Sequence, residues 1–292
     1  MAALAAAPWH ALRVLNLRVN SAGGAGAEAL AAAQFPALQE LRLSDNSVGD
    51  AGAASLAAAH FPALQVLHLG HNRLGPAGAA ALAAAPFPAL QTLNLGYNND
   101  LGDAGVASLV AAHFPALQEL NLKECSLGPE GAASLAAARW PALWKLKLGR
   151  NCLGPQGMAS LAAARFPALK VLDLDDNELG PAGATHLSTA RWPSLQTLSL
   201  CDNDLDSADV AALVAGRWPA LWGLFLSSND LGDAALPRPR RRGSGASGVG
   251  MEGQRQPRRG SGASGAAAAT LEASAWKASG SRAAAAAPVA LR

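Results

Sequence analysis

One phrase returns nine times along this chain at a spacing of 26 residues, which a single extra residue interrupts once, before the fifth copy. In its fullest form the phrase reads FPALQVLHLGHNRLG over residues 61–75. Its first leucine recurs at Leu12, Leu38, Leu64, Leu90, Leu117, Leu143, Leu169, Leu195 and Leu221. A fixed period of this length predicts a solenoid of stacked units. A solenoid presents an extended surface, so binding is its most general function.

Each repeat predicts a strand, a loop and a helix in that order. In Leu41-Arg42-Leu43 the apolar residues alternate with period two, which indicates a short strand with both leucines pointing inward. Residues 75–85 are rich in alanine, the best helix former. Pro76 suits the first helical turn, and the proline after each aromatic residue ends the helix.

The repeat resembles the leucine-rich repeat family, whose pattern is L-x-x-L-x-L-x-x-N/C-x-L. The pattern is met almost letter for letter by residues 38–48, 64–74, 143–153, 169–179, 195–205 and 221–231. The following LGxxGAxxLA is similar to the ribonuclease-inhibitor-like and GALA-type branches, which carry a helix in each repeat. The resemblance implies an α/β fold: a right-handed, horseshoe-shaped solenoid with a parallel sheet on its concave face and short helices on its convex face.

The asparagine of the pattern forms a column with a structural role. The chain bends where the strand ends, and a buried carboxamide can bridge the backbone groups of neighbouring turns. Cysteine, the family's alternative, offers only a weak donor, so we expect a modest local loss of stability at that repeat. The predicted ladder comprises Asn46, Asn72, Asn98, Cys125, Asn151, Asn177, Asn203 and Asn229.

The period ends near Leu236, which predicts two regions. Residues 1–236 form the repeat domain, with its first and last repeats incomplete. Residues 237–292 carry ten Lys/Arg and two Asp/Glu in a Gly/Ser/Ala-rich segment that is predicted to be disordered. This basic tail is either an arm for nucleic acid or anionic surfaces, or a solvated segment without a function. The second reading is favoured because no aromatic side chain lies among the arginines of residues 238–259.

Three cysteines without a framework spacing indicate free thiols in a reducing compartment, so we expect a cytoplasmic or nuclear location. The apolar start, residues 1–9, aligns with the helix end of a repeat and is not interpreted as a signal peptide. No membrane span is predicted, and we expect a monomer.

Two charged clusters lie at outward strand positions, and we predict that they bind a protein partner. The basic cluster comprises Lys123, Lys145, Lys147 and Arg150. The acidic cluster comprises Asp173, Asp175, Asp176 and Asp202. The two clusters either pair with each other as solvated surface charges, or form a bipolar docking site whose charges set the register of a partner. Trp144 and Trp222 replace a recurring glutamine and are expected to be exposed, with Trp144 as an anchor; Tyr97 and Phe225 are weaker candidates.

An arginine stripe precedes the aromatic residues of the later repeats. We expect these arginines to sit at helix C-termini, where they oppose the helix dipole; an anion-binding ladder is the alternative. They are Arg139, Arg165, Arg191 and Arg217.

The chain lacks the motifs of a metalloprotease, a serine hydrolase or a phosphate loop, so we predict no enzyme activity, no cofactor, no metal and no small-molecule substrate. The predicted function is a protein-interaction scaffold. An alternative is a regulator of a small GTPase, because the repeats resemble those of the Ran GTPase-activating proteins, which use a loop arginine; Arg73 and Arg150 lie near that loop. A third possibility is the sensor arm of a larger receptor.

Overall fold

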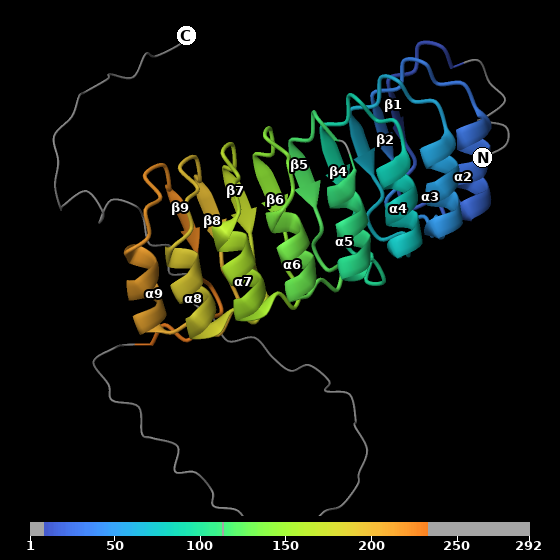
Figure 1. The fold of residues 1–292 in the computed structure, drawn as a ribbon. Coiled ribbons are helices and arrows are strands. Elements are labelled where there is room, and N and C mark those ends of the chain that lie inside the picture. The colour runs from blue at the N-terminus through green and yellow to red at the C-terminus, as the bar shows by residue number, and fades with distance from the viewer. Residues whose placement is uncertain (1–8, 113, 233–292) are drawn as a thin grey trace, which may run out of the picture.

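The computed structural model describes residues 9–112 and 114–232, in which short strands and helices alternate (Figure 1). The strands are β1 (Val14–Asn16), β2 (Glu40–Arg42), β3 (Val66–His68), β4 (Thr92–Asn94), β5 (Glu119–Asn121), β6 (Lys145–Lys147), β7 (Val171–Asp173), β8 (Thr197–Ser199) and β9 (Gly223–Phe225). The helices are α2 (Gly23–Ala32), α3 (Gly49–Ala58), α4 (Pro76–Ala84), α5 (Gly102–Ala111), α6 (Pro129–Ala136), α7 (Gly154–Ala163), α8 (Gly180–Ser188) and α9 (Ser207–Val214).

The strands form one parallel sheet in chain order, from β1 to β9. The central leucine of each strand pairs with the central leucine of the next, as Leu41 does with Leu67 and Leu67 with Leu93. The helices lie side by side on the opposite face (Figure 1). The predicted leucine-rich-repeat solenoid is therefore confirmed. We call the outward surface of the strands and of the turns that follow them the sheet face.

The core is a continuous layer between the strands and the helices. Both leucines of each LxL unit are buried in the interior repeats, as Leu146 and Leu148 are, each with none of its surface exposed. The aromatic residue before each proline is buried as well, for example Phe61 and Trp192. At the N-terminal end of the described residues Trp9 keeps 39% of its surface exposed.

The helices pack closely because their facing residues are small. A Cβ atom at Gly52 would lie 3.1 Å from the Cβ atom of Ala27 on the preceding helix. Asp50 also joins two helices, since its Oδ1 atom accepts hydrogen bonds from the backbone N–H groups of Gly75 (2.7 Å) and Gly78 (2.9 Å) at the start of α4. Asp50 lies in the first turn of its own helix, as expected for the helix dipole, and it additionally caps the helix of the next repeat.

The turn after each strand is built around the recurring asparagine of the repeat. Asn46 lies between Asp45 and Ser47, whose φ angles of 61° and 54° are in the left-handed region. The Oδ1 atom of Asn72 accepts hydrogen bonds from the N–H groups of Asn46 (3.0 Å) and Val48 (3.2 Å) of this turn. Each asparagine therefore supports the strained turn of the preceding repeat, and the strain of about 1–3 kcal/mol per left-handed residue is tolerated.

The extra residue of the fourth repeat and the cysteine of the fifth lie opposite each other. In the enlarged turn Leu101 donates its N–H to the carbonyl of Asn98 (2.9 Å) and does not need an acceptor from the next repeat. Cys125 faces this turn, and its Sγ atom donates to the carbonyl of Leu95 at 3.3 Å. Burial raises the pKa of the Cys125 thiol to about 12, so it stays protonated. The cysteine is tolerated because the turn has lost one of the donors that an asparagine would serve.

The eighth repeat has a different turn, and the expectation for the arginine stripe needs revision. Residues Asp206 to Asp209 replace the glycine-containing turn of the eighth repeat, and they form a capping box at the start of α9: Asp206 accepts from the N–H of Asp209 (3.0 Å), and Asp209 accepts from the N–H of Asp206 (2.9 Å). The prediction for the arginine stripe is wrong, because Arg139 and Arg165 follow the last residues of α6 and α7 by three and two positions. Both arginines are exposed on the connection back to the sheet.

The predicted tail, residues 237–292, and the proposed boundary at Leu236 lie outside the described residues, as do residues 1–8 of the apolar start.

Candidate partner-binding face

The sheet face combines a constant framework with variable side chains. Each strand turns its middle leucine inward and its first and third residues outward, as β6 does with Lys145 and Lys147 around the buried Leu146. The outward residues differ from strand to strand while the buried leucines repeat. Because strands lie about 4.8 Å apart, residues of several repeats can contact one partner.

The basic cluster is partly neutralised within its own neighbourhood. Lys145 Nζ lies 3.1 Å from Glu119 Oε2, and Arg150 Nη1 lies 3.3 Å from Glu124 Oε2. Both glutamates belong to the fifth repeat, so these cations pair toward β5 and not toward the aspartates of β7. The basic cluster is thus not a uniform cationic patch, and its unpaired members among the described residues are Lys123 and Lys147.

The acidic cluster has no cationic side chain paired with it among the described residues. Asp175 is held by hydrogen bonds that its Oδ1 atom accepts from Ser199 Oγ (2.6 Å) and from the N–H of Cys201 (2.8 Å). Asp176 and Asp202 are exposed at the ends of the turns. The aspartates therefore form an acidic surface, held in place at Asp173 and Asp175, that a cationic partner could neutralise.

The two clusters meet between β6 and β7, where Lys147 is the register neighbour of Asp173. Burial raises the pKa of Asp173, and the N–H of Asp175 opposes this effect by donating to Asp173 Oδ1. Lys123 and Lys147 also lower the pKa of Asp173, so they lie close enough to attract its carboxylate. We call this boundary, with Lys123, Lys147 and Asp173, the charge boundary.

The aromatic candidates differ in exposure. Trp144 was expected to be exposed and is half-buried, with Lys145 Nζ 5.4 Å from the centre of its ring. This cation–π contact covers the indole ring. Trp144 therefore packs against the basic cluster and does not project from it. Trp222 and Phe225 at the last repeat are 65% and 44% exposed, and Tyr97 is 41% exposed.

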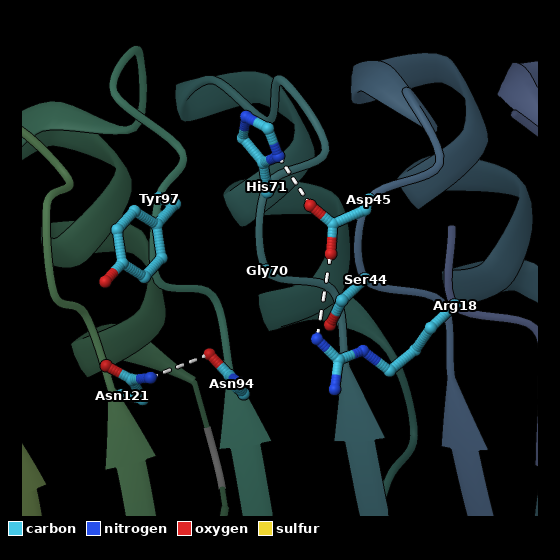
Figure 2. Close-up of a pocket in the computed structure, with 8 residues that line it drawn as sticks. All are labelled: Arg18, Ser44, Asp45, Gly70, His71, Asn94, Tyr97 and Asn121. Atoms are coloured by element: carbon cyan, nitrogen blue, oxygen red, sulfur yellow. Dashed lines mark hydrogen bonds and ion pairs between the residues drawn. The ribbon is translucent and has the colours of Figure 1, made fainter. Parts of the chain in front are cut away.

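A hollow of about 360 Å³ lies on the sheet face over Gly70, in the N-terminal half of the solenoid (Figure 2). The side chains of Arg18 and Ser44 flank it on one side and those of Asn94 and Asn121 on the other, as Figure 2 shows. Asp45, His71 and Tyr97 line the end formed by the turns. A hollow forms here because glycine has no side chain to fill the space between its neighbours.

A chain of polar contacts links three repeats beside this hollow. His71 Nδ1 lies 2.6 Å from Asp45 Oδ1, and Arg18 Nη2 lies 3.8 Å from Asp45 Oδ2. A second hollow of about 210 Å³ shares His71 and Tyr97 with the first and also contacts Arg73. Sequence reasoning placed the binding site on repeats five to eight and missed these hollows. The available signal was the pair of successive glycines, Gly70 and Gly96, in the column where neighbouring repeats carry Arg18, Ser44 and Lys123.

Among the described residues no group of three or more His, Cys, Asp or Glu side chains is placed to hold a metal ion. In the same part of the chain no helix is long and apolar enough to span a membrane. The three cysteines are unpaired: Cys125 is buried, Cys201 is half-buried and Cys152 is exposed.

Comparisons with known proteins agree with this architecture. The family model described as "Leucine Rich repeat" matches residues 36–57, 62–83, 88–110, 115–136 and 167–188. The chain belongs to the leucine-rich repeat family, whose fold is typically a non-enzymatic interaction scaffold. No curated protein sequence matches the chain.

Solved structures of bacterial leucine-rich repeat proteins are similar in fold. InlP of Listeria monocytogenes is 18% identical, with a TM-score of 0.50 over 76% of this chain and 58% of that chain. The leucine-rich repeat-containing protein LegL7 of Legionella pneumophila is 20% identical, with a TM-score of 0.48 over 76% of this chain and 84% of that chain. At 18% identity the likeness to InlP concerns the fold alone.

Proposed function

We propose that this chain is a non-catalytic scaffold that binds a protein partner on its sheet face. The observation that carries the proposal is the charge boundary. There Lys123 and Lys147 lie beside a fixed acidic surface, and none of the charges forms an ion pair in the described chain. Charges held without partners on a rigid sheet favour a partner with the complementary arrangement, because complementarity sets register and speeds association.

The docking site on this proposal comprises the residues predicted from the sequence, with roles refined by their contacts. Lys123 and Lys147 supply the free cations, and Asp173, Asp176 and Asp202 supply the free carboxylates. Lys145 and Arg150 shape the basic side through their pairs with Glu119 and Glu124, and Asp175 holds β7 to β8. Trp144 contributes apolar surface at the margin.

The unpaired cysteines support a reducing compartment, and on this proposal the partner is an intracellular protein. In an oxidising compartment the exposed Cys152 thiol would be a target for oxidation. The proposal does not require an oligomer or a small-molecule ligand.

Charge reversal tests the proposal. The full chain would be used as bait, the captured partner purified, and the association rate measured at two salt concentrations. In the double variant Lys123→Glu, Lys147→Glu we expect association to slow by about tenfold or more and its salt dependence to weaken. The matched control reverses Arg139 and Arg165, which are exposed away from the strands.

Both double variants change the net charge equally, so a general electrostatic effect would appear in both. If the arginine variant loses partner capture while the lysine variant keeps it, the proposed docking site is wrong. Far-UV circular dichroism of both variants checks that the solenoid is intact.

A further inference from the structure

The hollow over Gly70 exposes hydrogen-bond donors that the protein leaves unused. Ser44 is 6% exposed and lines the hollow, yet its hydroxyl makes no hydrogen bond to any described residue. The Oγ atom itself is not fully buried, so it faces the open space of the hollow. A Cβ atom at Gly70 would lie 3.6 Å from Ser44 Oγ, so the hydroxyl sits directly beside the glycine floor.

The backbone of Gly70 contributes a second unused donor. In the next repeat the equivalent N–H, that of Gly96, donates to the side chain of Asn94 two positions earlier, at 3.0 Å. The residue two positions before Gly70 is His68, and within residues 9–112 and 114–232 no acceptor meets the N–H of Gly70. The Nδ2 group of Asn94 is also without a hydrogen bond there, as its Oδ1 atom makes the contacts of this side chain.

The acceptors around the hollow are already engaged. Asn94 Oδ1 accepts from the N–H of Gly96 and from Asn121 Nδ2, both at 3.0 Å. Asn121 Oδ1 accepts from the N–H of Lys123 at 3.0 Å. Asp45 Oδ1 is in contact with His71 at 2.6 Å. The hollow therefore has unused hydrogen-bond donors and few unused acceptors. It suits a ligand group that only accepts hydrogen bonds.

Arg18 adds positive charge to this set. Its guanidinium lies 3.8 Å from Asp45 Oδ2, at the outer limit of an ion pair, and 53% of its side chain is exposed. A guanidinium at this distance retains N–H donors for a bidentate contact with a carboxylate. Figure 2 shows the guanidinium beside Ser44 on the same side of the hollow.

We propose that the hollow over Gly70 binds a carboxylate, supplied by an acidic side chain of the protein partner. Arg18 provides the charge, and Ser44 Oγ, the N–H of Gly70 and Asn94 Nδ2 provide neutral donors. Tyr97 forms the wall against which the stem of the acidic side chain packs. A phosphate dianion fits less well, because Asp45 faces the same space and Arg18 is the one permanent cation lining it. This inference rests on the proposed function for the origin of the carboxylate.

The test uses small probes and does not need the partner. The full chain, labelled with ¹⁵N, is titrated with the blocked tripeptide acetyl-Gly-Glu-Gly-amide, while the Gly70 amide, the Asn94 side-chain amide and the Arg18 Nε–H signals are followed by NMR. We expect saturable shifts of these signals with a Kd on the order of millimolar, as a single small group allows. The isosteric Gln tripeptide should bind at least about fivefold more weakly, because it lacks the charge.

Two variants and two controls locate the effect. Ser44→Ala and Arg18→Met should each weaken binding of the Glu tripeptide by about fivefold or more. Ser227→Ala, in the same column of the last repeat, and Arg139→Met, away from the strands, should leave binding unchanged. Equal binding of the Glu and Gln tripeptides, no saturation, or no loss in the two variants would each overturn the carboxylate site.

A phosphoserine tripeptide distinguishes the two kinds of oxyanion. Tighter binding of phosphoserine than of Glu at these same signals would overturn the assignment to a carboxylate. The titration is independent of the charge boundary, so its failure would leave the proposed function to the charge-reversal experiment.

Discussion

Removal of one ladder asparagine measures how much the turns depend on their neighbours. Asn72 is fully buried, and its carboxamide makes four hydrogen bonds. It donates to the carbonyls of Leu43 and Gly70, which keep other donors: Asn46 Nδ2 for the first and the N–H of Asp45 for the second. The two N–H groups that it accepts, those of Asn46 and Val48, have no such substitute.

The Asn72→Ala variant therefore leaves two buried donors without partners. Each unsatisfied donor costs about 1–3 kcal/mol, so we expect the free energy of unfolding to fall by about 4 kcal/mol in total. Denaturation in urea, followed by circular dichroism, measures the change through the midpoint and slope. The expected slope is unchanged, because the same surface is exposed on unfolding.

Asn229→Ala is the matched control. Asn229 Oδ1 accepts two equivalent bonds, from the N–H groups of Asn203 (2.9 Å) and Leu205 (3.1 Å), but it lies in the last described repeat and is only half-buried. Water can reach the vacated donors there, so we expect a loss of about 1 kcal/mol. Equal losses in the two variants, or a loss below about 0.5 kcal/mol for Asn72→Ala, would refute the role assigned to the buried carboxamide.

Three other properties follow from burial and titration. Leu146→Ala should cost about 2–4 kcal/mol by opening a cavity, whereas Lys147→Ala on the outward side should stay within about 0.5 kcal/mol; similar shifts of Tm would contradict the inward and outward assignment. The pKa of Asp173 is raised in the fold, so its ionisation opposes folding above that pKa. Asp173→Asn should raise Tm at pH 7, and the gain should vanish below about pH 3.9, where the unfolded carboxyl is protonated as well; a gain that persists in acid would contradict this sign. Iodoacetamide should modify exposed Cys152 in the native chain and leave buried Cys125 unmodified, as peptide mass mapping would show; modification of Cys125 first would show that the turn opens.

Much of the fold could be predicted from the sequence because its determinants are local and repeated. The alternation Leu-x-Leu sets the strand, and the asparagine three residues later marks the turn. The ion-pair partners of the charged side chains could not be predicted in this way. By register Lys147 beside Asp173 is placed like Lys145 beside Glu119, yet among the described residues only Lys145 forms the ion pair.

The hollow was missed for a related reason. Its neutral donors come from three repeats, and each residue alone is an ordinary member of its column: Ser44 and Gly70 in one, Asn94 in another. What distinguishes them is the hydrogen bonds they do not make, which depend on their neighbours in space. The contact between Cys125 and the enlarged turn of residues 98–101 was missed for the same reason. Either irregularity, taken alone, would be interpreted as a defect of its repeat.

Site-specific photocrosslinking tests most directly whether a protein partner binds the sheet face. A photoreactive phenylalanine analogue would replace Asn121 on β5 or Thr197 on β8, which flank the charge boundary, in the full chain. The controls carry it at Ala133 on α6 or Ala163 on α7, which are exposed on the helical face. After irradiation with the captured partner, cross-links at the two strand positions and none at the two helix positions are the predicted result. Cross-links from the helix positions alone would contradict the central claim.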